Sequence, residues 1–282
     1  MKITASRRDQ LGMQVYCRIY TMAYAELNGF EYIHTPFPER YKHLEDFFNL
    51  GFSHKQITND YKNVKDIGPQ VIPVSLCKKR NPLEPIRFSK SFLAKLRYKY
   101  YLTQKNNSKE FAESKGLRVS IHVRKCNDER KLKGRDPSHK MWDIRQSPEN
   151  YIPACFRKLA KIDARKISVH VHSNENLKQD WGYDLFQDPK FEIFTHFDSS
   201  LELCLHDLIS SDILFRYGIS SFSGICSIYN RKLSVFVTPL YQAHLANPYI
   251  SDNCCYMNEP LSFEPLPTFD EVALENFLCN HL

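Results

Sequence analysis

The stretch GLRVSIHVRKCNDER, residues 116–130, decides how the second half of the chain folds. Val119, Ile121 and Val123 alternate with other side chains, and this period of two predicts a strand with one apolar face. Arg124 and a dense mixture of charges come directly behind that strand. A run of charged and polar residues therefore begins where the predicted strand ends.

The same alternation continues toward the C-terminus. Strand-like segments recur at residues 117–124, 166–173, 191–197, 212–218 and 233–239, and helix-like segments lie between most of them, at 151–161, 200–211 and 221–230. In the second helix we predict a capping box of Ser199 with Glu202, followed by a buried face of Leu201, Leu205, Leu208 and Ile209. Alternating strands and helices predict a mainly parallel sheet, whose ligands lie beyond the carboxyl ends of its strands.

The first half of the chain is organised differently. A largely buried helix is predicted over residues 10–28, with Gly29 placed to end it, and a strand over 30–37 carries His34 at its end. Periodicity is weak from Pro36 to Pro85, and a basic amphipathic helix follows near residues 89–105. A polar run then marks a boundary, so we predict domains at 1–115 and 116–282, with a last helix at 268–280 packing back on the first.

Composition narrows the class of protein. The chain has 282 residues, 42% of them hydrophobic, which excludes a disordered chain. We see no hydrophobic segment typical of a signal peptide or a transmembrane helix. The nine cysteines include no C-x-x-C pair, which favours reduced thiols over a zinc site. The net charge of +7 is scattered, so a lysine-rich surface explains it without an anionic partner.

Four places are candidate binding sites. The guanidinium of Arg124, at a strand end, offers several fixed N–H donors to a phosphate. An ordinary ion pair with Asp128 or Glu129 would explain an arginine at this position equally well. Ser220, Ser221, Phe222 and Ser223 stand at a helix start that favours anions, although simple capping is the default explanation. Ser173 with Glu175 follows another strand, where a solvated helix start is the alternative, and Gly12 precedes the first helix.

Several known motifs are missing from the sequence. It has no G-x-G-x-x-G, no G-x-x-x-x-G-K-[ST] and no G-x-S-x-G, which disfavours standard dinucleotide enzymes, P-loop phosphotransferases and α/β-hydrolases. It also lacks Asp-x-Asp, a motif with which many nucleotide-sugar enzymes hold a metal. We therefore expect catalysis without a metal.

Taken in order, these segments resemble the inverting fucosyltransferase superfamily, which includes the α-1,2-, α-1,6- and protein O-fucosyltransferases. The early "QLGMQVYCRIYTMAYA" is similar to the family's glycine-containing loop and helix. His122, Val123, Arg124 and Lys125 stand where the family has H-x-R-R. Residues 173–175 correspond to its S-D-D, and "DLISSDILFRYGISSFS" matches its last pattern closely.

The resemblance implies a GT-B-like α/β architecture, with two Rossmann-like domains whose sheets are mainly parallel, and an inverting, metal-independent glycosyltransferase. Arg124, with His122 and Lys125, would hold the donor diphosphate. The other nucleotide-binding residues it implies are Gly12, Gln14, Ser173, Glu175, Ser220, Ser221, Phe222 and Ser223. The catalytic carboxylates available as general base are Asp128, Glu129 and Asp136, with His34 as an outside candidate.

Three departures from the family affect the donor. Lys125 replaces the second arginine, Asn174 replaces the first aspartate of S-D-D, and the carboxylate after the arginine is displaced by one position. GDP-fucose is the donor by resemblance, and a UDP-sugar such as UDP-xylose is the alternative. Outside this class, residues 90–101 could bind nucleic acid through a basic and aromatic face, and a glycan or sugar-nucleotide binder without activity is a third possibility.

The expected partners are a nucleotide-sugar donor, as a co-substrate, and a glycan or glycoprotein acceptor. No cofactor, metal or membrane span is expected, and nucleic acid is not the favoured partner. A lysine- and asparagine-rich chain without a visible signal fits a cytoplasmic enzyme, either bacterial or encoded by a large DNA virus of algae and active in the host cytoplasm.

Overall fold

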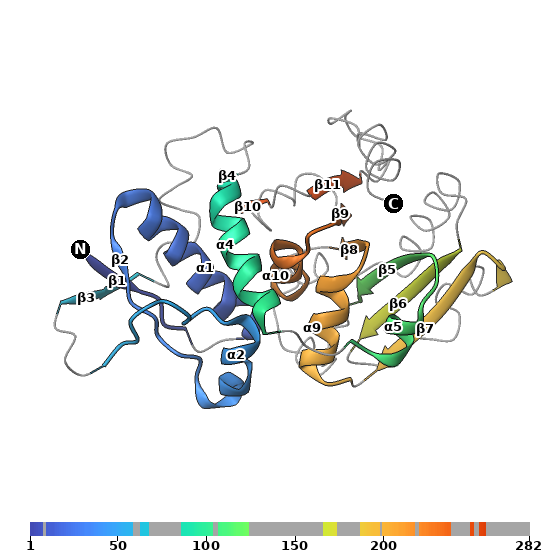
Figure 1. Cartoon of the computed structure of the whole chain (residues 1–282), viewed down its shortest axis with the longest axis horizontal. Coiled ribbons are helices and arrows are strands. Elements are labelled where there is room, and N and C mark those ends of the chain that lie inside the picture. Colours follow the sequence, from blue (N-terminus) through green and yellow to red (C-terminus); the bar gives the residue numbers. More distant parts are fainter. Residues whose placement is uncertain are drawn as a thin grey trace, which may run out of the picture. The chain divides into compact units, whose positions relative to one another are not determined.

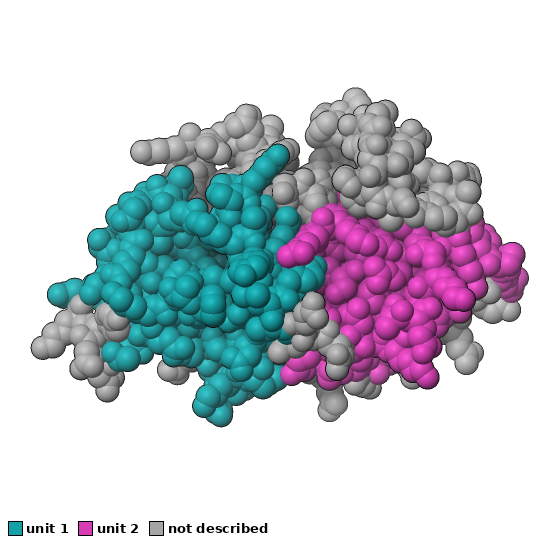
Figure 2. Space-filling model, viewed as in Figure 1, with its two compact units in different colours: residues 1–105, 221–229, 247–252 teal, residues 106–220, 230–246, 253–282 magenta. Residues whose placement is uncertain are grey.

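The structure is a computed structural model of the chain (Figure 1). The structure describes residues 1–7, 10–58, 63–67, 86–103, 107–123, 166–173, 187–197, 199–217, 220–237, 249–250 and 254–257. The chain forms two compact units (Figure 2): unit 1 holds residues 1–105, 221–229 and 247–252, and unit 2 holds 106–220, 230–246 and 253–282. The domain boundary at residue 115 stays a prediction, and the predicted last helix lies outside the described residues.

Unit 1 contains a small parallel sheet beside one long helix. Strands β2 (Glu31–Tyr32), β1 (Lys2–Thr4) and β3 (Val64–Asp66) form the sheet in that order. Helix α1 (Leu11–Asn28) is buried along most of its length, as its apolar residues predict. It ends where Gly29 takes a left-handed conformation with φ of 64° and donates to the carbonyl of Ala25, which confirms the predicted stop.

The described part of unit 1 also holds three α-helices, one 3₁₀ helix and a short strand pair. Helix α4 (Lys90–Leu102) begins at Ser89, whose hydroxyl accepts from the backbone N–H of Phe92. The region of weak periodicity forms a 3₁₀ helix η1 (Glu39–Leu44) and a short helix α2 (Glu45–Phe48). Helix α10 (Ser221–Tyr229) packs against α1 and α4, and β4 (Ile86–Arg87) pairs with β10 (Tyr249–Ile250).

Unit 2 is built on one parallel sheet of six strands. The strands are β5 (Leu117–His122), β6 (Ile167–Ser173), β7 (Phe191–Phe197), β8 (Ile213–Tyr217), β9 (Leu233–Val237) and β11 (Cys254–Met257). Their order across the sheet is β11-β9-β8-β5-β6-β7, and every pairing is parallel. The predicted α/β class, its parallel sheets and all five predicted strands are therefore confirmed.

The two faces of this sheet differ in chemistry although both are buried. Val119, Ile121, Val169 and Val171 stand on one face and are at most 1% exposed. Helices α5 (Lys109–Glu113) and α9 (Leu201–Ser210) lie over the other face (Figure 1). That second face carries Ser120, His170 and His172, which are also fully buried.

Helix α9 begins one residue later than predicted. Ser200, in an extended conformation with ψ of 148°, is the N-cap, and its hydroxyl accepts from the N–H of Leu203 at 3.2 Å. The capping box of Ser199 with Glu202 is therefore wrong, because the residue three positions after the true cap is Leu203, which has no polar side chain to bond back to the cap. Leu205, Leu208 and Ile209 are buried as predicted. The predicted helix at 151–161 lies outside the described residues.

An ion network joins the amino ends of three strands in unit 2. Asp212 accepts from the backbone N–H of Arg118 at 2.8 Å and from its guanidinium at 3.2 Å, and it also contacts Lys232. Burial alone would raise the pKa of Asp212, but the hydrogen bonds from Arg118 and Lys232 lower it below the ordinary 3.8. The carboxylate is thus fully partnered at neutral pH.

Candidate functional site

The strand order of unit 2 defines one place where a ligand is expected. Strands β5 and β8 are neighbours in the sheet, with Val119 opposite Ile213 and Ile121 opposite Phe215. The chain then continues outward from β5 to β6 and β7 on one side, and from β8 to β9 and β11 on the other. Ligands of open α/β sheets bind at such a reversal, outside the carboxyl ends of the strands.

Three predicted site residues stand at this edge. His122 is the last residue of β5, and Val123 behind it donates from its N–H to the carbonyl of His172 at 2.8 Å. Ser173 is the last residue of the neighbouring β6, and Ser220 comes shortly after β8. Ser173 and Ser220 are buried, at 7% and 5% exposed.

The charged candidates lie outside the described residues. They are Arg124, Lys125, Asp128, Glu129, Asp136 and Glu175. Arg124 and Lys125 follow Val123 by one and two positions, and Glu175 follows Ser173 by two. Their positions and their roles therefore stay predictions.

The serine-rich segment forms the start of α10. Ser221 and Phe222 are partly exposed in the first turn, whereas Ser223 is only 1% exposed. The free N–H groups of a first helical turn favour an anion. Ser220 precedes this turn directly and belongs by its contacts to unit 2, whereas α10 packs with unit 1.

Gly12 is explained by packing within unit 1. A Cβ atom at this position would lie 2.6 Å from the hydroxyl oxygen of Ser221 and 2.7 Å from the backbone nitrogen of Phe222. Helix α1 can approach the first turn of α10 so closely because residue 12 has no side chain. Gln14, two residues further along the helix, is fully buried. Their predicted contact with a diphosphate stays a prediction.

His34, the outside candidate for the general base, is closed off inside unit 1. Its side chain is 0% exposed, its Nδ1 lies 3.2 Å from the hydroxyl of Tyr32, and its Nε2 bonds to Glu45. Glu45 also accepts from the N–H of Phe37 at 2.7 Å. Burial raises the pKa of Glu45, but the bonds from His34 and Phe37 outweigh it and lower that pKa. Both ring nitrogens are occupied, which favours a structural role.

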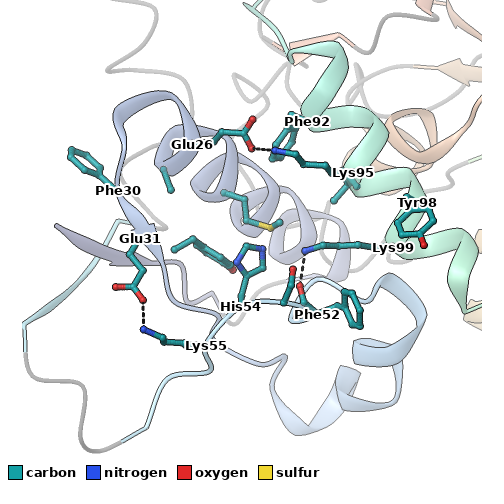
Figure 3. Close-up of a pocket in the computed structure, with 15 residues that line it drawn as sticks. Glu26, Phe30, Glu31, Phe52, His54, Lys55, Phe92, Lys95, Tyr98 and Lys99 are labelled. Atoms are coloured by element: carbon teal, nitrogen blue, oxygen red, sulfur yellow. Dashed lines mark hydrogen bonds and ion pairs between the residues drawn. The ribbon is translucent and has the colours of Figure 1, made fainter.

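A pocket of about 580 Å³ lies in unit 1 between α1, α4 and the segment after α2 (Figure 3). Its wall combines apolar and aromatic groups with three lysines and two glutamates. The lining residues labelled in Figure 3 are Glu26, Phe30, Glu31, Phe52, His54, Lys55, Phe92, Lys95, Tyr98 and Lys99. Part of this wall comes from the weakly periodic region that begins at Pro36.

The charges of this pocket are partly paired. Lys55 bonds Glu31 at 2.8 Å and Lys95 bonds Glu26 at 3.3 Å, both near the surface. Burial lowers the pKa of Lys99 to about 8, and its ammonium donates to the carbonyl of Phe52 at 2.7 Å. Burial also lowers the pKa of His54 to about 4, so this ring is neutral at pH 7. The pocket can therefore donate hydrogen bonds to a polar ligand.

Sequence reasoning missed a buried polar cluster under α9. The cluster contains His170, His172, His196 and Asp207. Two histidines spaced two apart in one strand must share a face, so the segment SVHVHS carried a usable signal. Arg216 in β8 was missed as well. It is 3% exposed and follows Phe215, the strand partner of Ile121, so it stands near the carboxyl edge described above.

Comparison with known proteins finds structural likenesses alone. No protein-family model and no curated protein matches the chain. POFUT1 in complex with GDP-fucose aligns over 83% of this chain and 96% of that chain, at 13% identity and a TM-score of 0.48. The E. coli heptosyltransferase WaaC with ADP aligns over 99% of both chains, at 9% identity and a TM-score of 0.47.

A mutant of Arabidopsis thaliana FUT1 in complex with GDP aligns over 83% of this chain and 70% of that chain, at 13% identity and a TM-score of 0.40. With identities and TM-scores this low, the likenesses carry no argument about the reaction. The fold rests on the strand order itself. Within the described ranges, no helix combines the length and apolar character that crossing a bilayer requires.

Proposed function

We propose that the protein is a glycosyltransferase that takes a sugar from a nucleotide-sugar donor. The observation that carries the proposal is the adjacency of β5 and β8. These two strands precede Arg124 and the serine-rich segment in the sequence, and they lie side by side at the reversal point of a parallel sheet. Those are the two segments that sequence motifs assign to the donor diphosphate.

In this proposal Arg124 binds the diphosphate and stabilises the charge that develops as the nucleotide leaves. Ser220 offers its hydroxyl to the same group, and the sequence motifs assign Ser221, Phe222 and Ser223 to the donor as well. Inversion requires a general base that takes the proton of the acceptor hydroxyl, and Asp128, Glu129 and Asp136 remain the proposed carboxylates. No metal takes part in these steps as proposed.

The donor is the finer part of the proposal. GDP-fucose is supported by the sequence motifs, whereas a UDP-sugar such as UDP-xylose is supported by the changes at Lys125 and Asn174. The diphosphate contacts are common to both donors, so the reaction class does not depend on this choice. The acceptor is proposed to be a glycan or glycoprotein, and the pocket beside α4 is the described cavity that could hold part of it.

The nucleic-acid alternative is weakened by the contacts of α4. Lys95 pairs with Glu26, Arg97 donates to the carbonyl of Ile228 at 2.9 Å, and Lys99 is buried. These three cations therefore do not form one exposed basic face, and phosphate binding needs such a face. If polynucleotides bind at all, a steep salt dependence should accompany the binding.

A thermal-shift screen tests the proposal. The purified protein is heated with GDP, UDP, GDP-fucose, UDP-xylose, UDP-glucose and UDP-galactose in the presence of a chelator. One nucleotide family should raise the midpoint, and Arg124→Ala should abolish that rise. Arg231→Ala is the matched control, because Arg231 is exposed and precedes the amino end of β9. No shift with any compound at millimolar concentration would contradict the proposal.

A further inference from the structure

The cluster under α9, together with His122, places five imidazole and carboxyl groups on one side of the sheet in unit 2. His122, His172 and His196 are register partners on β5, β6 and β7, so they form one row across the three strands. His170 stands two residues before His172 on the same face, and Asp207 reaches the cluster from α9. His170, His172 and Asp207 are 0% exposed, and His196 is 9% exposed.

The hydrogen bonds around His170 fix its tautomer. Ser114 donates its hydroxyl proton to the carbonyl of Glu110 at 2.7 Å, so its oxygen accepts from the Nε2–H of His170 at 2.9 Å. The Nδ1 of a neutral His170 is then unprotonated, and it accepts from the Nε2–H of His196 at 3.0 Å, a proton that a bound ion would replace. An imidazole that donates one N–H to a fixed oxygen and presents its other nitrogen is typical of a metal ligand.

Two members of the cluster are incompletely satisfied. Neither ring nitrogen of His172 has a hydrogen-bond partner among the described residues, and the same is true of the Oδ2 of Asp207. The two groups lie 3.7 Å apart, which is too long for a hydrogen bond. Buried polar groups without partners are costly, so an arrangement that leaves several of them together requires an explanation.

A bound ion can give a partner to the Oδ2 of Asp207 and to one ring nitrogen of His172. At Zn–N and Zn–O distances of about 2.0–2.2 Å, two ligands of a tetrahedral ion are separated by roughly 3.3 Å. Ligand atoms of His170, His196 and Asp207 all lie within 4.8 Å of one another. The nitrogens of His170 and His196 face each other, so their rings must turn slightly toward Asp207 for both to bind one ion.

We propose that His170, His196 and Asp207 bind a divalent transition-metal ion of the zinc type, with His172 as the fourth ligand. Three imidazoles and one carboxylate make a closed four-coordinate set, which is the pattern of a structural site. The ion joins β6, β7 and α9 beneath the carboxyl edge of the sheet. It transfers no group, so this site is independent of the metal-free glycosyl transfer proposed above.

The composition of the site also explains why cysteine spacing did not predict it. Within the described residues the free cysteines are Cys17, Cys204 and Cys226, and the ligand group contains none of them. A zinc site built from strand histidines leaves no C-x-x-C signature. The expectation that the chain binds no metal rested on that signature and on the absence of Asp-x-Asp.

The experiment uses the full-length protein and zinc alone as the probe. Protein purified from zinc-containing medium is desalted and its metal content measured by mass spectrometry, with about one zinc per chain expected. Chelator-treated protein should then gain several degrees in its unfolding midpoint when zinc is added. Cobalt in place of zinc should give the visible bands of a tetrahedral site without thiolate charge-transfer absorption.

Matched variants assign the ion to the cluster. Asp207→Asn keeps an oxygen for the N–H of Ser108, which donates to Asp207 at 3.0 Å, so this variant should fold and yet bind zinc at least tenfold more weakly. His196→Gln should do the same, whereas His43→Gln, at an exposed histidine of unit 1, should bind like the unmodified protein. Unchanged zinc binding in both ligand variants, no zinc binding at all, or a cobalt–thiolate spectrum would each overturn the proposal.

Discussion

The two units bury histidines in opposite ways. In unit 1, His34 has a partner on each ring nitrogen, because Tyr32 and Glu45 stand on either side of it. In unit 2, His172 has no hydrogen-bond partner among the described residues and lies 3.7 Å from an equally unsatisfied oxygen of Asp207. We call a buried polar group closed when its hydrogen-bonding atoms all have partners, and such a group stabilises the fold. We call it open when at least one of these atoms has no partner among the described residues, and such a group can bind a further atom.

The pKa shifts around His34 and around His172 agree with this difference in hydrogen bonding. The carboxylate of Glu45 is held in its charged form, since hydrogen bonds lower its pKa in spite of burial. Burial raises the pKa of Asp207 to about 6, and the N–H of Ser108 compensates only in part. Burial also lowers the pKa of His170 to about 3, so its ring is a neutral base at pH 7. Neutral imidazoles beside a poorly solvated carboxylate are suited to bind a cation.

Breaking the closed site should have the largest effect. Glu45→Ala leaves the Nε2 of His34 and the N–H of Phe37 without their partner, and we expect a loss of about 3 kcal/mol in the free energy of unfolding. Urea denaturation followed by circular dichroism measures it. Glu39→Ala is the control, because the side chain of Glu39 is 89% exposed and its removal should cost about 0.5 kcal/mol or less. Equal losses for the two variants would contradict the closed site.

A second closed carboxylate, Asp212, provides a test within unit 2. Asp212→Asn should lower the free energy of unfolding by about 2 kcal/mol at pH 7, since an amide cannot pair with both Arg118 and Lys232. The folded-state pKa of Asp212 is lowered, so its contribution is present above the ordinary 3.8 and is lost as the pH falls through the folded value. The difference between the two proteins should therefore shrink below pH 3.8. A difference that stays constant as the pH falls well below 3.8 would refute the pairing.

The open carboxylate should respond differently to the same chemical change. In chelator-treated protein, Asp207→Asn should alter the free energy of unfolding by less than about 1 kcal/mol, because the amide oxygen can still accept from Ser108. Urea denaturation of the two metal-free proteins provides the comparison. A loss as large as that of Asp212→Asn would show that Asp207 is fully partnered without an ion.

Lys99 is an intermediate case and should give the smallest effect, a shifted titration. Its ammonium has a carbonyl partner, but burial lowers its pKa to about 8. A base with a lowered folded-state pKa stabilises the fold above its ordinary 10.5, and that contribution is lost as the pH falls through about 8. NMR titration of the lysine side-chain signals should show one midpoint near pH 8 that disappears in Lys99→Arg. A midpoint near 10.5 for Lys99 would contradict its burial.

The strands could be predicted from the sequence because their evidence is local. Alternating apolar residues placed all five predicted strands of unit 2, and the glycine at residue 29 placed the end of α1. The cap of α9 was missed by one residue, since two adjacent serines at 199 and 200 offer the same hydroxyl. Sequence alone cannot choose between them, because the choice depends on which backbone turns into the helix.

The sites were harder to predict because they depend on contacts between distant residues. Gly12 was taken as a ligand contact, but its visible role is to let α1 approach Ser221, more than two hundred positions away. The cluster around His170 joins residues of β6, β7 and α9 that no short motif connects. By contrast, the strands that lead to the carboxyl edge were predicted correctly, because alternation is visible within each segment alone, and the ligand site at that edge stays a prediction.

Release of the nucleoside diphosphate from the sugar nucleotide tests the central claim most directly. Chelator-treated protein is incubated separately with GDP-fucose, UDP-xylose, UDP-glucose and UDP-galactose, and the liberated GDP or UDP is measured with and without candidate glycan acceptors. The account predicts release from one donor, faster with an acceptor and at least about 100-fold slower in Arg124→Ala, with Arg231→Ala unchanged. No release from any donor, or release that Arg124→Ala leaves intact, would contradict it.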